Sequence, residues 1–178
     1  MDLKVLVISI CLVFLAAGCE KKEPKAGPGG GSLGVEQELR FLQNVVKDDP
    51  NNINAWIKLG NINMDMGKYQ DAVASYSRAL ELDPNNLEVR VDMGSCYRYM
   101  GMPEKAIGEY KKALAINPDH PFANKNMAIV LAYDMRKYSE AAEVLDNYLK
   151  KNPGDPDAAK VREEIRSLRA KAANPSLP

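Results

Sequence analysis

The residues best suited to covalent chemistry lie near the start of the chain, where small side chains directly precede a cysteine. The run from Leu15 to Cys19 reads Leu-Ala-Ala-Gly-Cys, and residues 5–17 are uninterruptedly apolar or small. Small residues at that place are what a peptidase needs when cleavage must expose a nucleophilic thiol for acylation. The apolar segment is shorter than the roughly 20 residues of a membrane span. The pattern therefore predicts an export signal that ends at a reactive cysteine.

This segment resembles the lipobox of bacterial lipoproteins. The resemblance implies a signal peptide over residues 1–18, cleavage after Gly18 and diacylglycerol on Cys19. We expect a chain anchored by lipid in the bacterial cell envelope and facing the periplasm. The outer membrane is favoured because Glu20 follows Cys19 in place of the aspartate linked to inner-membrane retention in some bacteria. The alternative is a short anchor helix that is never cleaved, which also tethers the chain to a membrane.

Other reactive side chains do not form a catalytic or metal-binding set. His120 is the sole histidine and is expected in a turn, so neither a catalytic triad nor a histidine-containing metal site can form. Cys96 occupies an apolar helix position and is interpreted as a buried, inert thiol, which leaves no partner for an intramolecular disulfide. The methionines are interpreted as core filling. We therefore predict no enzyme activity, no cofactor, no metal and no small-molecule substrate.

Charge excludes one large class of partner. Lysine plus arginine and aspartate plus glutamate number 24 each among the 178 residues, and no basic block occurs. Nucleic-acid binding depends mainly on neutralising phosphate charge. A neutral chain of this kind is not expected to bind nucleic acid.

The middle of the chain repeats with a period of 34 residues. The motif at residues 49–52, Asp-Pro-Asn-Asn, recurs at 83–86, and its counterpart at 117–120 reads Asn-Pro-Asp-His. A third unit begins at Pro121 and needs one extra residue in its inner turn, because Leu145 and its neighbours fall one place late. The positions that align between the first two units are Trp56, Leu59, Gly60, Ala72, Tyr76, Ala79 and Pro84 with Arg90, Met93, Gly94, Ala106, Tyr110, Ala113 and Pro118.

This pattern resembles the tetratricopeptide repeat, which has W-x2-L-G-x2-Y, A-x3-F and P at the same period. The resemblance implies an all-α fold, a right-handed α-solenoid of three helical hairpins with an N-terminal half-repeat helix and a C-terminal capping helix. Arg90 and Asn124 replace the tryptophan of the pattern, which is expected to weaken individual packing contacts.

Helical periodicity and turn residues favour the same fold. Each first helix has one apolar face, alanines in the second helices permit close approach, and prolines or glycines stop the helices. The expected organisation is a signal peptide 1–18, a lipidated cysteine and flexible linker 19–34, a repeat domain 35–171 with repeats 53–86, 87–120 and 121–155 and a cap helix 156–171, and a disordered tail 172–178.

The resemblance places a binding groove on the concave wall made by first-helix positions 2, 5, 9 and 12. The apolar side chains among them, mixed with hydrogen-bonding ones, suit an extended or helical segment of another envelope protein. The candidate groove residues are Asn54, Ile57, Asn61, Met64, Glu88, Val91, Ser95, Arg98, Phe122, Lys125 and Ile129, with Ala132 at the last position.

Three further interpretations concern the partner. Family members that grip the C-terminal carboxylate of heat-shock chaperones use lysine, asparagine and arginine at five positions, where this chain has Ile57, Asn61, Asp92, Phe122 and Asn126. Only Asn61 matches, so that clamp is not expected. A weaker likeness is to the tetratricopeptide pilotin lipoproteins that help secretins assemble. The alternative is a structural homo-oligomer whose groove holds another copy or its own tail.

Overall fold

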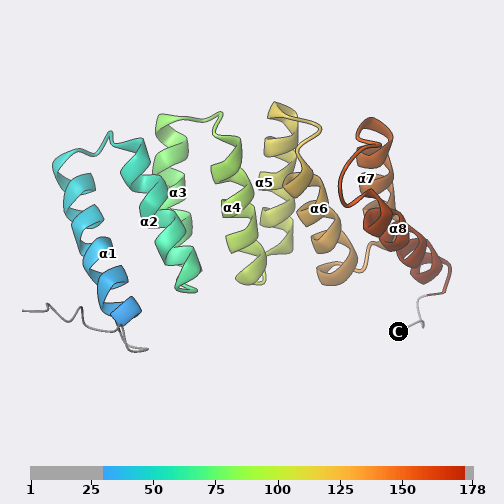
Figure 1. Cartoon of the computed structure of the whole chain (residues 1–178), viewed down its shortest axis with the longest axis horizontal. Helices are drawn as coiled ribbons and strands as arrows, with labels where there is room; N and C mark the ends of the chain where they lie inside the picture. Colours follow the sequence, from blue (N-terminus) through green and yellow to red (C-terminus); the bar gives the residue numbers. More distant parts are fainter. Residues whose placement is uncertain (1–29, 175–178) are drawn as a thin grey trace, which may run out of the picture.

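The structure, a computed structural model, describes residues 30–174, which form helices joined by short turns and contain no strand (Figure 1). Within this range no helix is both long and apolar enough to cross a membrane. The predicted signal peptide, Cys19 and residues 175–178 lie outside the described residues. The elements are α1 (Gly30–Asp48), α2 (Ile53–Asp65), α3 (Tyr69–Leu82), α4 (Leu87–Tyr99), α5 (Pro103–Ile116), α6 (Pro121–Ile129), the π-helical turn η1 (Val130–Asp134), α7 (Tyr138–Lys151) and α8 (Ala158–Ala173).

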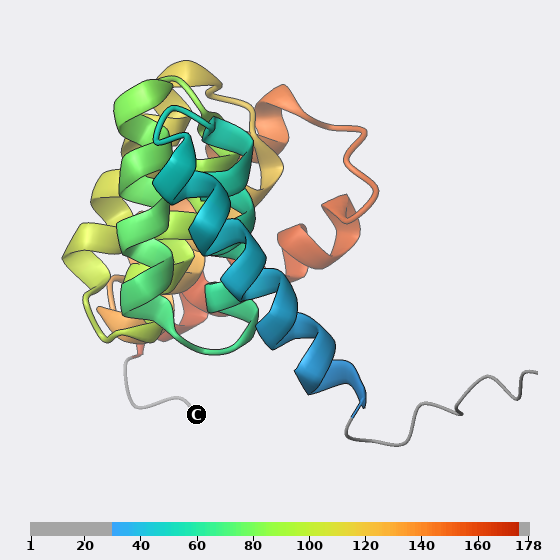
Figure 2. The same ribbon diagram turned by 90° about the vertical axis from the view of Figure 1, so that its left-hand side faces the viewer.

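The helices follow one another as antiparallel hairpins, which confirms the predicted all-α solenoid. The pairs α2–α3, α4–α5 and α6–α7 stand side by side in chain order, with α1 at one end and α8 at the other (Figure 1). Viewed from the first end, α1 crosses the front of the stack (Figure 2). The buried apolar residues form clusters that join each hairpin to its neighbour, and α1 to the first hairpin. Every hairpin therefore depends on the next one to bury its apolar side.

A glycine in the left-handed conformation ends the first helix of the first two hairpins. Gly67 and Gly101 both have φ of 71°. Beyond Gly67 the backbone N–H of Lys68 donates to the carbonyl of Asn63 at 2.8 Å, so a carbonyl left over at the helix end is satisfied. Helix α3 starts at Tyr69, so the chain reverses its direction within a few residues.

The third hairpin reverses differently, and here the expectation from the sequence was wrong in detail. Its extra residue does not lengthen the inner turn but lies within the end of the first helix, as the π-helical turn η1. The N–H of Met135 donates to the carbonyl of Val130, five residues earlier, at 3.1 Å. One additional residue in a helical turn widens it locally without breaking the ladder. The left-handed position then moves to Arg136, with φ of 55°.

Arg136 is thus a non-glycine residue in a conformation that disfavours side chains, since its Cβ crowds the following carbonyl. We expect Arg136→Gly to raise the free energy of unfolding by about 1 kcal/mol. Chemical denaturation measures the change. Gly101→Arg, the reciprocal substitution in the second hairpin, should lower it by at least as much, and a loss of stability in Arg136→Gly would contradict this account.

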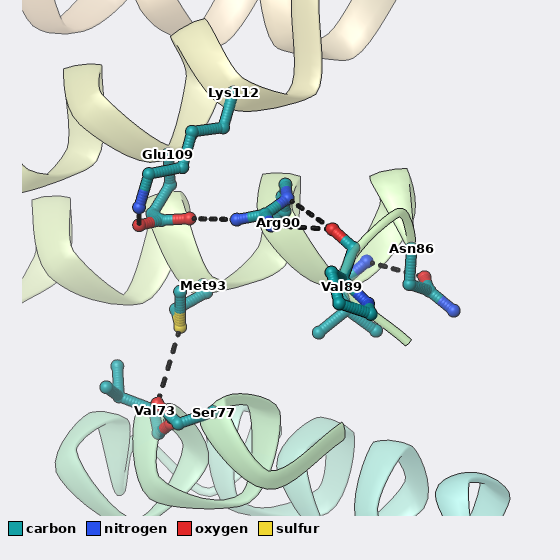
Figure 3. Close-up of polar contacts among 9 residues, drawn as sticks. Val73, Ser77, Asn86, Val89, Arg90, Met93, Glu109 and Lys112 are labelled. Carbon is teal, nitrogen blue, oxygen red and sulfur yellow. Dashed lines mark hydrogen bonds and ion pairs between the residues drawn. The ribbon is translucent and has the colours of Figure 1, made fainter. Parts of the chain in front are cut away.

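Arg90 and Asn124, which replace the tryptophan of the repeat pattern, keep one of the contacts that Trp56 makes. Trp56 Nε1 donates to the carbonyl of Pro50 at 2.9 Å, Arg90 Nη2 donates to that of Pro84 at 2.6 Å, and the Asn124 amide donates to that of Pro118 at 3.0 Å. Arg90 also pairs with the buried Glu109 at 3.1 Å, which accepts from Lys112 as well (Figure 3). The three hairpins therefore share one hydrogen bond to the preceding turn despite different side chains.

Both ends of the solenoid differ from the expected boundaries. Helix α1 begins at Gly30, so residues 30–34, which were expected in the linker, are helical. Helix α8 runs from Ala158 to Ala173, which places residues 172 and 173 of the expected tail in the helix. The helix continues because Lys171, Ala172 and Ala173 are good helix formers, and proline follows only at position 175.

Candidate functional site

The first helices of successive hairpins, together with α8, form one wall of the solenoid. Contacts between neighbours establish this. Ile57 and Met64 of α2 pack against the core cluster that includes Met93 of α4. Asn126 of α6 lies 3.5 Å from Ser95 of α4, and Lys125 of α6 lies 3.1 Å from Asp157, the N-cap residue of α8. We call the surface formed by α2, α4, α6 and α8 the groove wall. Side chains on this wall are the ones that a partner lying across the hairpins would meet.

Most of the predicted groove residues reach solvent, but two do not. Asn54, Asn61, Glu88 and Phe122 are exposed, and Phe122 is 63% exposed. Val91 is only 4% exposed, because it joins the core formed by α5, α6 and α7, and Ala132 is buried as well. These two residues cannot touch a partner. The remaining predicted residues are half-buried: Ile57, Met64, Ser95, Arg98, Lys125 and Ile129.

Two polar groove residues are tied to a tyrosine of their own hairpin. The hydroxyl of Tyr76 donates to Asn61 Oδ1 at 2.8 Å, and Ser95 Oγ lies 3.2 Å from the hydroxyl of Tyr110. Both tyrosine rings are fully buried, and their burial raises the pKa of each phenol. Asn61 and Ser95 therefore hold the tyrosines in place as well as facing the wall.

Charged groove residues are also partly committed to neighbouring helices. Arg98 Nε donates to Asp134 Oδ2 at 2.6 Å. Lys125 pairs with Asp155 and Asp157 at 3.4 and 3.1 Å. These links join α4 to the end of η1, and α6 to the start of α8. They help to set the spacing of the helices that form the wall.

His120 has a structural position that the sequence did not reveal. It is buried at the start of α6, where its Nδ1 accepts from the backbone N–H of Ala123 at 3.2 Å and its Nε2 lies 3.2 Å from Glu88. It thus serves as the N-cap that Asn52 and Asn86 provide for α2 and α4. The expectation of a turn residue was incomplete, because an imidazole nitrogen accepts a hydrogen bond as an asparagine oxygen does.

Cys96 is confirmed as a buried thiol with 0% exposure. Burial, and next the nearby Asp92, raise the pKa of the Cys96 thiol to about 12. A thiol that stays protonated at neutral pH is a poor nucleophile. Within residues 30–174 no group of three or more histidine, cysteine, aspartate or glutamate side chains is arranged to hold a metal ion.

The half of the groove wall formed by α2 and α4 carries carboxylates close together. Burial, and next the neighbouring Glu88 and Asp65, together raise the pKa of the Asp92 carboxyl to about 6. Among the described residues, neither Asp65 nor Asp92 has an ion pair. The negative charge of this region is therefore not balanced within the fold.

This unbalanced charge predicts an unusual pH dependence of stability. Because the folded-state pKa of Asp92 lies above its ordinary value of 3.8, ionisation weakens the fold as pH rises from about 4 through 6. We expect Asp92→Asn to raise the free energy of unfolding at pH 7 by about 2 kcal/mol and to have little effect at pH 3.5. Urea unfolding at both pH values checks this. Glu143→Gln, an exposed carboxylate on α7, is the matched control, and an equal gain for Asp92→Asn at both pH values would contradict the account.

The sequence reasoning missed the contribution of α8 to the groove wall. A cavity of 330 Å³ lies between α6 and α8, with the base formed by α7. The motif Asn152-Pro153-Gly154-Asp155 has the spacing of the earlier Asp-Pro-Asn-Asn motifs, and it could have marked α8 as the first helix of a fourth unit. The residues that line the cavity are Lys125, Ala128, Ile129, Leu145, Asp157, Lys160, Val161, Glu164 and Leu168.

Family models of the tetratricopeptide repeat match this chain over two segments. One covers residues 53–86 and another covers residues 97–165. Together they cover the three hairpins except residues 87–96, and α8 as far as residue 165. A search of curated proteins finds no match.

Solved structures with the same fold include several repeat proteins. MamA is 23% identical with a TM-score of 0.63, and the match covers 83% of this chain and 98% of that one. A tetratricopeptide repeat protein from Parabacteroides merdae is 24% identical with a TM-score of 0.69, over 79% of this chain and 56% of that one. The first TPR of Spaghetti (RPAP3), solved with the HSP90 peptide SRMEEVD, is 20% identical with a TM-score of 0.59, over 68% of this chain and 96% of that one. At these identities the likeness establishes the fold.

Proposed function

Because this chain belongs to the tetratricopeptide repeat family, we propose that it is a binding scaffold which holds a segment of another protein against the groove wall and catalyses no reaction. The observation that carries the proposal is the accessible apolar surface of this wall. Phe122 is 63% exposed although it lies on a helix whose other face is already in the core, and a mainly apolar cavity opens between α6 and α8. Exposed apolar surface of this kind marks interaction sites.

The chemistry of the wall separates this scaffold from one that binds acidic peptides. The RPAP3 neighbour was solved with the peptide SRMEEVD, which contains two glutamates and an aspartate. At the positions of the carboxylate clamp this chain has Ile57, Asp92, Phe122 and Asn126 beside Asn61. An aspartate at such a place repels a carboxylate. The proposed partner segment is therefore not a chaperone C-terminus.

The proposal also places the scaffold in the bacterial cell envelope, anchored by lipid on Cys19 and facing the periplasm. Its support is the Leu-Ala-Ala-Gly-Cys segment that follows the apolar residues 5–17. A pilotin-like assembly factor for a secretin would be one member of this class. The chain from residue 20 to residue 29 could reach at most about 35 Å, enough to hold the repeats near the membrane surface without fixing their orientation.

The anchor is tested by substitution of the cysteine. We expect Cys19→Ser to remove the lipid, so that the chain moves from the membrane fraction to the soluble fraction and its mass no longer includes diacylglycerol. Cys11→Ser, within the predicted signal peptide, is the control and should leave the lipid in place. An unaltered chain with an unprocessed N-terminus and no diacylglycerol in its mass would instead favour the uncleaved anchor helix.

A second candidate function is self-association, favoured by exposed apolar residues at the other end of the stack. Phe41 is 65% exposed and Val35 is 37% exposed, both on α1. Large apolar side chains exposed at the end of a solenoid can pair with another molecule. In this case the partner would be a second copy of the chain, and α1 would lie in the contact.

Photocrosslinking in intact cells distinguishes the two candidates. A photoreactive residue replaces Phe122 or Ile129 on the groove wall, and Phe41 on α1 as the matched exposed position. The scaffold proposal expects one heterologous adduct from both groove positions and not from Phe41. Adducts with twice the mass of the chain, formed from Phe41, would support self-association, and only lipid or self-adducts from the groove positions would overturn the scaffold proposal.

A further inference from the structure

The cavity between α6 and α8 arises because the third hairpin lacks the tyrosine that fills the same place in the first two. In the second hairpin the Tyr110 ring lies against Gly94, where a Cβ would be 2.6 Å from Tyr110 Cε1. The Tyr110 hydroxyl then meets Ser95 at 3.2 Å. The counterparts of these three residues in the third hairpin are Ala128, Ile129 and Leu145, and all of them line the cavity.

The remaining walls make the cavity suitable for one large apolar side chain. Val161 and Leu168 of α8 complete an apolar lining opposite Ile129. Polar bridges lie on both sides of Ile129. Lys125 of α6 meets Asp157, the N-cap residue of α8, at 3.1 Å, and Tyr133 of η1 donates to Glu164 of α8 at 2.6 Å. A volume of 330 Å³ is at the small end of ligand-binding pockets. The bridges leave a bounded site on the groove wall in place of a continuous apolar channel.

The half of the groove wall formed by α2 and α4 favours a positively charged group on the partner. Glu88 and Asp92 are four residues apart on α4 and therefore neighbours on one face of that helix. Asp65 at the end of α2 lies near enough to raise, with Glu88, the pKa of the Asp92 carboxyl. Within residues 30–174 the only histidine, lysine or arginine that pairs with any of these carboxylates is His120, which lies 3.2 Å from Glu88, and Lys58 on α2 pairs with none of the three. A partner that crosses both halves of the wall meets carboxylates at one end and an apolar cavity at the other.

Resting on the proposed function, we infer that the partner segment combines a bulky apolar residue with lysine or arginine. The apolar side chain enters the cavity between α6 and α8, and the cationic side chain faces Asp65, Glu88 and Asp92. Burial of the apolar side chain supplies affinity, while opposite charges set the direction of the segment along the wall. A cationic group also offsets the repulsion that Glu88 and Asp65 exert on the Asp92 carboxylate.

The second hairpin provides the design of a variant in which the cavity is filled by an arrangement that the fold already contains. Ala128→Gly, Ile129→Ser and Leu145→Tyr together copy the Gly94, Ser95 and Tyr110 arrangement of the second hairpin into the third. A charge variant combines Asp65→Asn with Asp92→Asn. Its control combines Glu38→Gln with Glu143→Gln, which changes the net charge equally on exposed positions outside the wall.

The test is selection of binders from a displayed library of random peptides on the full chain. We expect selected peptides to share an apolar residue and a lysine or arginine at a constant separation. A selected peptide should bind the cavity-filled variant and the charge variant at least tenfold more weakly, while the control variant binds it within twofold. Raising the salt concentration should weaken binding to the unaltered chain more than to the charge variant.

The outcomes distinguish a failure of this inference from a failure of the proposed scaffold function. Peptides without cationic residues, or unchanged affinity for the charge variant, would overturn the inference and leave the scaffold proposal standing. No selected peptide at all would overturn both. Circular dichroism checks that the cavity-filled variant folds; if it does not, Ile129→Asp with Ile116→Asp as the exposed control applies the same test to the cavity.

Discussion

Ending the chain after Pro156, which removes α8, is expected to abolish cooperative unfolding of the repeats. Val161, Ile165 and Leu168 of α8 are nearly fully buried against α6 and α7. Burial of each such side chain contributes about 1.5–3 kcal/mol, so their loss approaches the 5–15 kcal/mol that stabilises a typical domain. Removal of the helix also uncovers the apolar side of α7. Thermal unfolding followed by circular dichroism would show a broad, shallow transition in place of a sharp one.

A point substitution provides a graded version of this experiment. Leu168→Ala should lower the free energy of unfolding by about 3 kcal/mol, because a 1% exposed leucine leaves a cavity when truncated. Ser167→Ala, on the exposed side of the same helix, should change it by less than about 0.5 kcal/mol. A truncated chain with an unchanged unfolding midpoint would show that α8 is not part of the cooperative unit.

Gly94→Ala is expected to destabilise the protein by about 3 kcal/mol although it adds a single methyl group. The new Cβ would lie 2.6 Å from Cε1 of Tyr110, whose ring is fully buried. Overpacking of a close-packed core forces side chains from their rotamers or shifts the backbone. Gly108→Ala on α5 is the control, because nothing lies within 4 Å of its added Cβ.

A double-mutant cycle tests the cause of this loss. The third hairpin pairs Ala128 with Leu145 at the positions where the second pairs Gly94 with Tyr110. Tyr110→Leu alone should destabilise the protein, since it loses the ring and its contact with Ser95. Gly94→Ala combined with Tyr110→Leu should be less destabilised than the sum of the two single variants, by at least 1 kcal/mol. Additive effects would mean that the clash with the ring is not the source.

Some features of this fold are determined by residues close together in the sequence. The 34-residue period, the Asp-Pro-Asn-Asn motifs and the glycines at Gly67 and Gly101 were sufficient to predict the hairpins and their order. Turn and cap chemistry acts over a few residues, and helical periodicity over one helix, so a local pattern carries this information. The same reasoning correctly assigned Cys96 to the core.

Other features depend on contacts between hairpins, which no local pattern specifies. Val91 and Lys125 both occupy position 5 of a first helix, but Val91 is buried by the neighbouring hairpin while Lys125 borders a cavity. The extra residue of the third unit was visible in the sequence, but its place in the π-helical turn was not. Accessibility and cavity shape depend on how side chains from different hairpins meet, and so the tertiary structure alone decided which predicted groove residues a partner can reach.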